Sequence, residues 1–273
     1  MSSEPLILAS VSGNVGRLTF NRPAQRNAMS VDMMKQFHAR LQEMEADAAI
    51  RCVVLDGAGG NFVAGGDIKS WDRLRSMTPV ERGEDFRRRL RDVKPLILLL
   101  DNYSKPLIAA VRGYAAGAGL CFVAAADFVV ADASATFLFA NIRTSLVPDM
   151  GLSHFLPRAI GYRQAVRLGL LSGQLNAADA KQIGLVTDLV DAEKFEDTIA
   201  TLCNALIALP ATAIRETRRA MRGAGTGELE RRFQAECDGL AACAATDDFL
   251  EAITAFAEHR KPNFGQTRKP TRP

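Results

Sequence analysis

The chain has 273 residues, of which 48% are hydrophobic and 24% charged. This length allows one large domain or two small ones, and the composition excludes disordered and fibrous proteins. No uncharged apolar run approaches the roughly 18 residues that a membrane-spanning helix needs, and the first residues lack the basic start of a secretory signal. The five scattered cysteines indicate neither a disulfide framework nor a zinc site. We therefore expect a cytoplasmic protein with reduced thiols, no membrane partner and no metal.

The net charge of +3 is unevenly distributed along the chain. Residues 71–91 contain seven arginines and four acidic residues, and residues 259–273 contain five basic residues and no acidic one. The rest of the chain is acidic, so these clusters suit a small polyanionic ligand. The alternative is that they are solvated helix faces and a loose tail. A sequence pI of 8.7 is too modest to indicate a nucleic-acid partner.

The first half of the chain mixes strands with helices. Alternating apolar residues flank a Ser-Gly-Asn turn near the start, and Ser30 is placed to cap a helix with an apolar face. Thr78-Pro79 opens a second, longer helix. We expect strands at residues 6–9, 15–20, 52–55, 107–111, 128–131 and 136–139, and helices at 30–46, 78–101 and 120–126.

The second half is predicted to be almost wholly helical from Asp149 onward, with breaks at Gly161, at the 172–176 loop and at Pro210, and one late strand at 186–190. Strand–helix units followed by helices predict an α/β fold with a helical appendage. We divide the chain into a core at residues 1–200, a helical region at 201–260 and a basic tail at 261–273. The last dozen residues are expected to be mobile.

Several common motifs are absent or incomplete. Gly57-Ala-Gly59-Gly60 begins like a dinucleotide-binding loop, but Phe62 stands where the third glycine would fall. The three histidines lie too far apart for a helical metal pair. A Ser-His-Asp triad stays open, because triads assemble in space rather than in sequence. We expect no separate cofactor.

Two stretches share one design, in which a buried strand leads through a loop of small residues. They are CVVLDGAGGNFVAGGDIKSW, which starts at Cys52, and PLIAAVRGYAAGAGLCFVAA, which starts at Pro106. Small residues leave backbone N–H groups unpaired and approachable, above all where a helix begins. Two such loops that converge on one point would form an oxyanion hole.

These loops belong to a longer set of matches. NRPAQRNAMS at 21–30, AGGDIK at 64–69, KPLIAAVRGYAAGAG at 105–119, the helix-plus-GLV region at 156–190 and AFAEHRKPNF at 255–264 follow one another in order. With these segments the chain resembles the enoyl-CoA hydratase/isomerase (crotonase) superfamily over nearly all of its length. The resemblance implies a spiral of β-β-α turns, a C-terminal helical trimerisation region, a homotrimer or dimer of trimers, and an acyl-CoA thioester substrate.

The resemblance also assigns site residues. It implies that the backbone N–H groups of Gly66 and Ala118 form the oxyanion hole. The segments that match the family's coenzyme A contacts contain Arg26, Ala28, Ala64, Gly65, Asp67, Ile68, Phe256 and Lys261, of which Phe256 and Lys261 would reach a neighbouring subunit's coenzyme A. For Arg26 and Lys261, an ordinary exposed charge is the alternative. We expect the acyl pocket to include Trp71, Leu74, Tyr114, Cys121, Asn141, Leu146 and Met150.

The departures from the family pattern point to the chemistry. The family's hydratases use two glutamates, and Cys121 and Asn141 stand at those positions. Without these carboxylates we expect hydration to be feeble, because general acid–base catalysis typically contributes 10²–10⁴-fold. Asp149 stands where the family's isomerases carry an aspartate. We therefore expect double-bond migration with Asp149 as the single acid–base, its pKa raised by apolar neighbours.

Other interpretations stay open. Asp149 is also an acceptable N-cap for a helix at residues 150–160. The protein could be a hydratase that uses other residues, a silent coenzyme A-binding or scaffold protein, or a hydrolase or dehalogenase with Asp149 as nucleophile. Cys121 could be a nucleophile, although a cysteine in an apolar helix is usually a small core residue.

Overall fold

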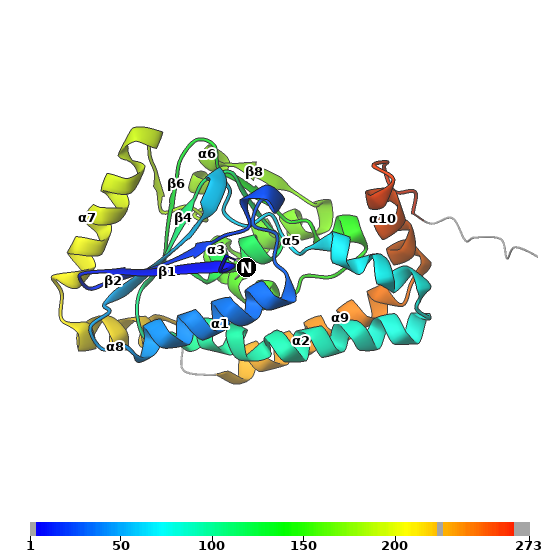
Figure 1. Cartoon of the computed structure of the whole chain (residues 1–273), viewed down its shortest axis with the longest axis horizontal. Helices are drawn as coiled ribbons and strands as arrows, with labels where there is room; N and C mark the ends of the chain where they lie inside the picture. The colour runs from blue at the N-terminus through cyan, green and yellow to red at the C-terminus, as the bar shows by residue number, and fades with distance from the viewer. Residues whose placement is uncertain (1–3, 223–225, 265–273) are drawn as a thin grey trace, which may run out of the picture.

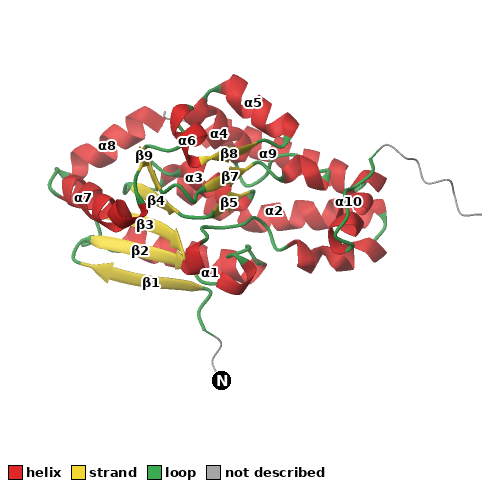
Figure 2. Ribbon diagram, turned by 90° about the horizontal axis from the view of Figure 1, so that it is seen from above, coloured by secondary structure: helices red, strands yellow, loops and turns green. Residues whose placement is uncertain are grey.

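The computed structural model describes residues 4–222 and 226–264. It contains a six-stranded sheet in the order β1-β2-β3-β4-β6-β9 and a three-stranded sheet in the order β5-β7-β8 (Figures 1 and 2). The strands are β1 (Ile7–Ser12), β2 (Val15–Phe20), β3 (Cys52–Gly57), β4 (Leu107–Val111), β5 (Tyr114–Ala116), β6 (Phe128–Ala131), β7 (Thr136–Leu138), β8 (Gln174–Asn176) and β9 (Asp188–Leu189). The α-helices are α1 (Val31–Ala46), α2 (Pro79–Asn102), α3 (Ala118–Ala125), α4 (Leu152–Ile160), α5 (Tyr162–Leu171), α6 (Ala177–Gln182), α7 (Phe195–Ile207), α8 (Ala211–Arg222), α9 (Thr226–Ala244) and α10 (Asp247–Ala257).

Successive units of two strands and a helix stack on one another. β4-β5-α3 is followed by β6-β7-α4, with β4 parallel to β6 and β5 parallel to β7. Two isolated parallel bridges, Val63 to Ala115 and Met29 to Gly66, extend the second layer towards the N-terminus. This stacking gives the spiral of β-β-α turns that the family resemblance implies.

The helix starts follow from their capping residues. The Ser30 hydroxyl accepts a hydrogen bond from the N–H of Met33, which satisfies one of the unpaired donors of α1. Thr78 and Glu81 form a capping box at the start of α2, the Thr78 hydroxyl accepting from the Glu81 N–H. Both helices therefore begin where the sequence predicts.

The parallel strands β3, β4 and β6 are covered on both faces, as parallel strands usually are. In β3, Val53 and Leu55 face the main core, which also contains the apolar faces of α1 and α3. Cys52 and Val54 point the other way and pack against α7. The alternation explains why this strand is apolar along its whole buried length.

The structure differs from the predicted elements at several places. Tyr114–Ala116 and Gln174–Asn176 form short strands where loops are predicted, and β9 is shorter than the predicted strand at 186–190. β1 extends three residues further than predicted, to Ser12. Helix α4 begins at Leu152 and its N-cap is Gly151, so Asp149 is not the capping residue of this helix.

The C-terminal helices close one side of the molecule. α9 packs along α2 (Figure 1), and the buried Arg82 guanidinium of α2 donates to the Ala244 carbonyl at 2.6 Å. Of the tail predicted to be mobile, residues 261–264 are exposed and residues 265–273 lie outside the described residues. In the part of the chain that is described, no single helix has the length and apolarity of a membrane span; residues 192–207 and 211–222 reach them only as a pair bent by 103°.

Candidate active site

The loop that contains Gly66 is fixed by the segment at residues 22–29. Met29 donates its N–H to the Gly65 carbonyl at 2.8 Å and accepts from the Asp67 N–H at 3.1 Å. The Arg22 guanidinium pairs with the Asp67 carboxylate at 3.0 Å. Met29 therefore bonds to the two residues that flank Gly66, not to Gly66 itself. In this arrangement the Gly66 N–H points away from Met29.

The second N–H belongs to Ala118, the first residue of α3. The preceding Gly117 has φ +49° and ψ −111°, which turns the chain sharply into the helix. A side chain at Gly119 would place a Cβ 2.2 Å from the Val63 carbonyl oxygen, so this approach requires glycine. Within the described residues, neither Gly66 N–H nor Ala118 N–H donates to a protein acceptor.

The two loops converge. A Cβ built on Gly117 would lie 3.5 Å from the Gly65 Cα, and one on Gly65 would lie 3.6 Å from the Ala116 oxygen. Gly66 and Ala118 line the same pocket, which has a volume of about 220 Å³. The two loops therefore converge, and two amides that have no acceptor in the described part of the chain border one cavity.

Asp149 lies in this pocket, in the connection before α4. Its carboxylate accepts a hydrogen bond from the Asn141 Nδ2 at 3.0 Å. Burial raises the pKa of Asp149 to about 6, and the Asn141 hydrogen bond opposes this rise by stabilising the charged form. The carboxyl group therefore titrates near the pH at which an acid–base catalyst is most useful.

Cys121 and Asn141 form hydrogen bonds to the turn that contains Asp149 and Met150. The Cys121 thiol is fully buried and donates to the Met150 carbonyl at 2.8 Å. Burial raises the pKa of this thiol well above its ordinary value, so it stays protonated. Asn141 also donates to the Val147 carbonyl at 3.1 Å, while its buried Oδ1 has no hydrogen-bond partner among the described residues. That oxygen remains available to a donor.

A carboxylate that sequence reasoning missed lies close by. Glu236, on α9, is 3% exposed and accepts hydrogen bonds from the backbone N–H groups of Gly151 and Ser153. Burial raises the pKa of Glu236 to about 7, and the Asp149 charge contributes to the rise while the two N–H donors oppose it. No sequence signal places Glu236 here, because it follows Gly151 by 85 residues.

The pocket collects many, but not all, of the predicted site residues. It is lined by Ala64, Gly65, Gly66, Asp67, Ile68, Trp71, Ala118, Asn141, Leu146, Asp149 and Met150. The predictions for Leu74, Tyr114 and Cys121 as acyl-pocket residues differ from the structure. Leu74 is fully buried in the core, Tyr114 is 37% exposed, and Cys121 lies behind Met150.

The predicted coenzyme A contacts outside the loop also lie away from the lining. Arg26 is exposed and its guanidinium stacks over the Tyr114 ring at 5.3 Å. Ala28 is half-buried behind the Arg22 guanidinium, which donates to its carbonyl at 2.5 Å. Phe256 and Lys261 are exposed at and beyond the end of α10, and their predicted role towards a neighbouring subunit stays a prediction.

Two helices supply walls that the sequence analysis did not assign to the site. The residues are Met29, Val31, Met34, Lys35 and His38 at and within α1, and Phe86, Arg89, Leu90, Asp92, Val93 and Leu96 of α2. Trp71 meets Phe86 edge-on, with ring centroids 5.6 Å apart. A helical apolar stripe predicts burial but does not distinguish a pocket wall from the core. The sequences of α1 and α2 therefore indicate buried side chains but not which of them line the pocket.

The basic cluster at residues 71–91 is largely engaged. The buried Asp85 carboxylate pairs with Arg73 at 2.8 Å, with Arg89 at 2.7 Å, and with Arg88.

Among the described residues, no group of three or more His, Cys, Asp or Glu side chains is placed to hold a metal ion.

Comparisons with known proteins agree with this geometry. The profile of the enoyl-CoA hydratase/isomerase family matches residues 10–268. The chain is 34% identical over 259 residues to 1,2-epoxyphenylacetyl-CoA isomerase of Escherichia coli, covering 94% of this chain and 97% of that protein. It is 36% identical over 253 residues to "Probable enoyl-CoA hydratase EchA12" of Mycobacterium tuberculosis, covering 92% and 89%.

A solved structure shows the same architecture. The crystal structure of an enoyl-CoA hydratase from Mycobacterium avium subsp. paratuberculosis aligns with a TM-score of 0.84 at 29% identity, over 96% of this chain and 99% of that one. The chain therefore belongs to the enoyl-CoA hydratase/isomerase family and has its α/β fold. Its relatives include both hydratases and isomerases.

Proposed function

We propose that this protein is an isomerase that moves a double bond in an acyl-CoA thioester, with Asp149 as the single acid–base. The observation that supports it is one pocket that contains the Asp149 carboxylate and two N–H groups with no acceptor in residues 4–222 and 226–264. Cys121 and Asn141 occupy the positions where the family's hydratases carry glutamates. The pocket therefore has the means to stabilise an enolate and to move one proton.

The proposed reaction begins when the thioester carbonyl oxygen accepts hydrogen bonds from the N–H groups of Gly66 and Ala118. Asp149 removes a proton from C2 of a 3-enoyl thioester. The C–H bonding electrons pass into a dienolate, whose negative charge rests on the carbonyl oxygen. Asp149 then returns the proton to C4, and the double bond settles between C2 and C3. No water is consumed, and each N–H donor contributes about 3 kcal/mol to the barrier reduction.

The pKa of Asp149 suits this role. With a pKa of about 6 the carboxyl group is mostly ionised at neutral pH, so it can accept the proton. It is a stronger base than an ordinary aspartate, whose pKa is about 3.9. The same value makes the protonated form acidic enough to give the proton back.

Hydration is the alternative, and it needs a second group that activates water. The Cys121 thiol is fully buried and its raised pKa keeps it protonated. Asn141 does not titrate, although its unpaired Oδ1 could accept a hydrogen bond from water or substrate. A silent coenzyme A-binding protein is the third candidate, and it predicts binding without turnover.

The acyl group that we propose is apolar. The apolar part of the pocket lining includes Trp71, Phe86, Leu90, Val93, Leu96, Leu146 and Met150. Burial of such a group is favourable in proportion to its apolar area. Because one relative is named for an aromatic-derived epoxide thioester, ring-containing acyl-CoA compounds belong among the substrates to be tested.

The test is a paired assay on wild type and Asp149→Asn. One assay follows trans-3-enoyl-CoA to 2-enoyl-CoA, and the other follows 2-enoyl-CoA to 3-hydroxyacyl-CoA. We expect isomerisation in the wild type, a fall of about 10³-fold in kcat in the variant, and negligible hydration in both. Robust hydration that survives Asp149→Asn would support the hydratase. Bound acyl-CoA without turnover in either assay would support the silent protein.

A further inference from the structure

Glu236 is a buried carboxylate that the proposed proton transfer does not use. Its Oε2 accepts from the Gly151 N–H at 2.7 Å and its Oε1 accepts from the Ser153 N–H at 2.8 Å. These are two of the donors that the start of a helix leaves unpaired. The side chain reaches this place from α9, far along the chain.

The backbone that Glu236 holds is the turn that follows Asp149. Met150 has φ +57° and Gly151 has φ +80°, so two successive residues are left-handed. This conformation is unfavourable for methionine, and a strained residue persists where its surroundings hold it. At Gly151 a Cβ would lie 2.8 Å from Ile97 Cγ2 and 2.9 Å from the Phe155 ring. The turn is therefore tightly enclosed.

Three side chains hold this turn from different directions. Asn141 bonds the Asp149 carboxylate at 3.0 Å, and Cys121 bonds the Met150 carbonyl at 2.8 Å. Glu236 holds the two amides on the far side of Met150. Of these contacts, only those of Glu236 come from the C-terminal helices.

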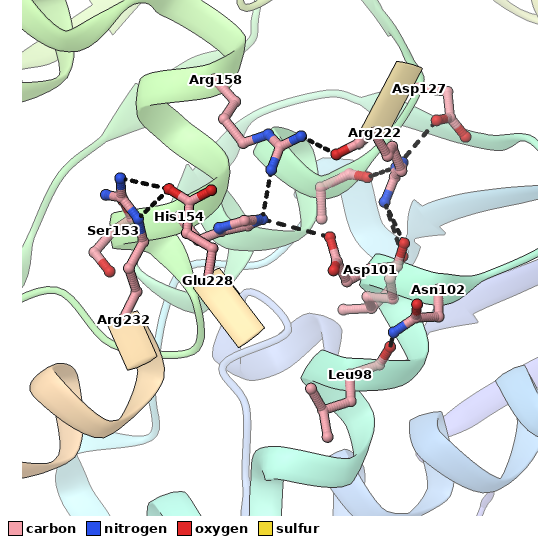
Figure 3. A network of polar contacts seen from close by, with 12 residues as sticks. Leu98, Asp101, Asn102, Asp127, Ser153, His154, Arg158, Arg222, Glu228 and Arg232 are labelled. Atoms are coloured by element: carbon pink, nitrogen blue, oxygen red, sulfur yellow. Dashed lines mark hydrogen bonds and ion pairs between the residues drawn. The ribbon is translucent and has the colours of Figure 1, made fainter. Parts of the chain in front are cut away.

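α9 is itself well anchored. Arg232, one turn before Glu236, donates to the Ser153 carbonyl at 3.2 Å and pairs with Glu228 at 2.9 Å. Figure 3 shows Arg232, Glu228 and Ser153 beside His154, whose ring faces Asp101 of α2. Glu230 pairs with Lys94 of α2 at 3.3 Å. Glu236 therefore projects from a fixed support.

We propose that Glu236 is a positioning residue, which holds the Asp149 carboxylate at the reacting carbon atoms through the Gly151 and Ser153 amides. The inference rests on the proposed function of Asp149. It makes α9 part of the catalytic apparatus, although α9 supplies no residue to the pocket lining in the described chain.

The experiment compares Glu236→Gln and Glu236→Ala in the full chain, with trans-3-enoyl-CoA as substrate. Gln keeps one acceptor oxygen, but its amide nitrogen faces the other N–H, whereas Ala removes both acceptors. We expect kcat to fall about 10-fold in Gln and about 100-fold in Ala, because a displacement of about 1 Å has effects of that size. KM should stay within about threefold, since the lining and the N–H donors are unchanged.

Gln234→Ala is the control, because Gln234 lies on the same helix and its exposed side chain donates, within the described residues, only to Asp238 of that helix. It should keep the wild-type kcat. Active protein is counted by the binding stoichiometry of a saturated acyl-CoA, so a partly unfolded variant does not mimic the effect. If Glu236→Ala does not fold, the ratio of the Glu236→Gln kcat to the wild-type kcat decides the outcome.

The outcomes separate this inference from the proposed function. If Asp149→Asn is inactive while both Glu236 variants keep the wild-type kcat, the positioning role is wrong and the acid–base role stands. A rise in KM with an unchanged kcat would also overturn it, because substrate binding would then be what Glu236 affects. If Asp149→Asn keeps its isomerase activity, the proposed function itself fails.

Discussion

An aromatic cluster and the turn that carries Asp149 both border α3, but opposite kinds of interaction build them. The cluster consists of Phe20, Phe37, Phe62 and Phe122, with ring centroids 5.0 to 5.6 Å apart. All four side chains are fully buried or nearly so, and apolar packing holds them.

The turn from Asn141 to Ser153 has the opposite character. It contains a carboxylate with a raised pKa, an amide oxygen that has no partner among the described residues, and a left-handed methionine. Each of these features costs stability where it occurs. The fold therefore gains stability in the apolar cluster, whereas the turn that carries Asp149 lowers it.

The largest expected effect on stability lies in the aromatic cluster. Phe37→Ala removes a ring that contacts Phe20 and Phe122, so we expect the free energy of unfolding to fall by about 3–5 kcal/mol. Urea unfolding measures it. Activity per folded molecule should stay within about threefold of wild type. A loss below about 1 kcal/mol would show that the cluster is not the stabilising region.

Asp149→Asn should stabilise the folded protein, whereas Phe37→Ala destabilises it. The folded-state pKa of about 6 lies above the ordinary value, so ionisation of Asp149 destabilises the folded protein as the pH rises from about 4 through 6. Removing that group should raise the free energy of unfolding at pH 7 by about 2–3 kcal/mol. The difference from wild type should vanish near pH 4. Equal stability of both proteins at pH 7 would contradict this account.

The pH dependence of activity tests whether Asp149 is the group with a pKa of about 6. We expect the acid limb of kcat/KM to have a midpoint near pH 6, since the ionised Asp149 is the active form. Asn141→Ala removes the hydrogen bond that favours this form, so the midpoint should move up by about one pH unit. Asn102→Ala, at the surface end of α2, should leave it unchanged. A downward shift would oppose the assignment.

Much of the fold could be predicted because its signals are local. The Ser30 cap, the Thr78 capping box and the apolar face of α1 act within a few residues of one another. β5 and β8 escaped prediction because strands of three residues carry too little pattern, and both depend on pairing with β7. Long-range pairing is not visible in a short segment.

The candidate site likewise has a part that the sequence predicts and a part that it does not. The N–H donors and Asp149 lie in segments whose residues carry a recognisable pattern, and the structure brings them to one pocket. Leu74, Tyr114 and Cys121 lie outside the pocket lining, because sequence proximity to a loop does not fix the direction of a side chain. Glu236 and the α2 wall are tertiary features. Distance along the chain hides the bonds of Glu236 to Gly151 and Ser153 and the place of α2 in the pocket wall.

The most direct test of single-carboxylate proton transfer follows the proton itself. A 3-enoyl-CoA that carries deuterium at C2 is isomerised in ordinary water within a single turnover, and the product is analysed by mass spectrometry and NMR. Because Asp149 is held in a largely apolar pocket, we predict that a measurable fraction of the deuterium reappears at C4. A product in which the hydrogen newly added at C4 comes entirely from water, even in the first turnover, would contradict the transfer of the proton by Asp149 alone.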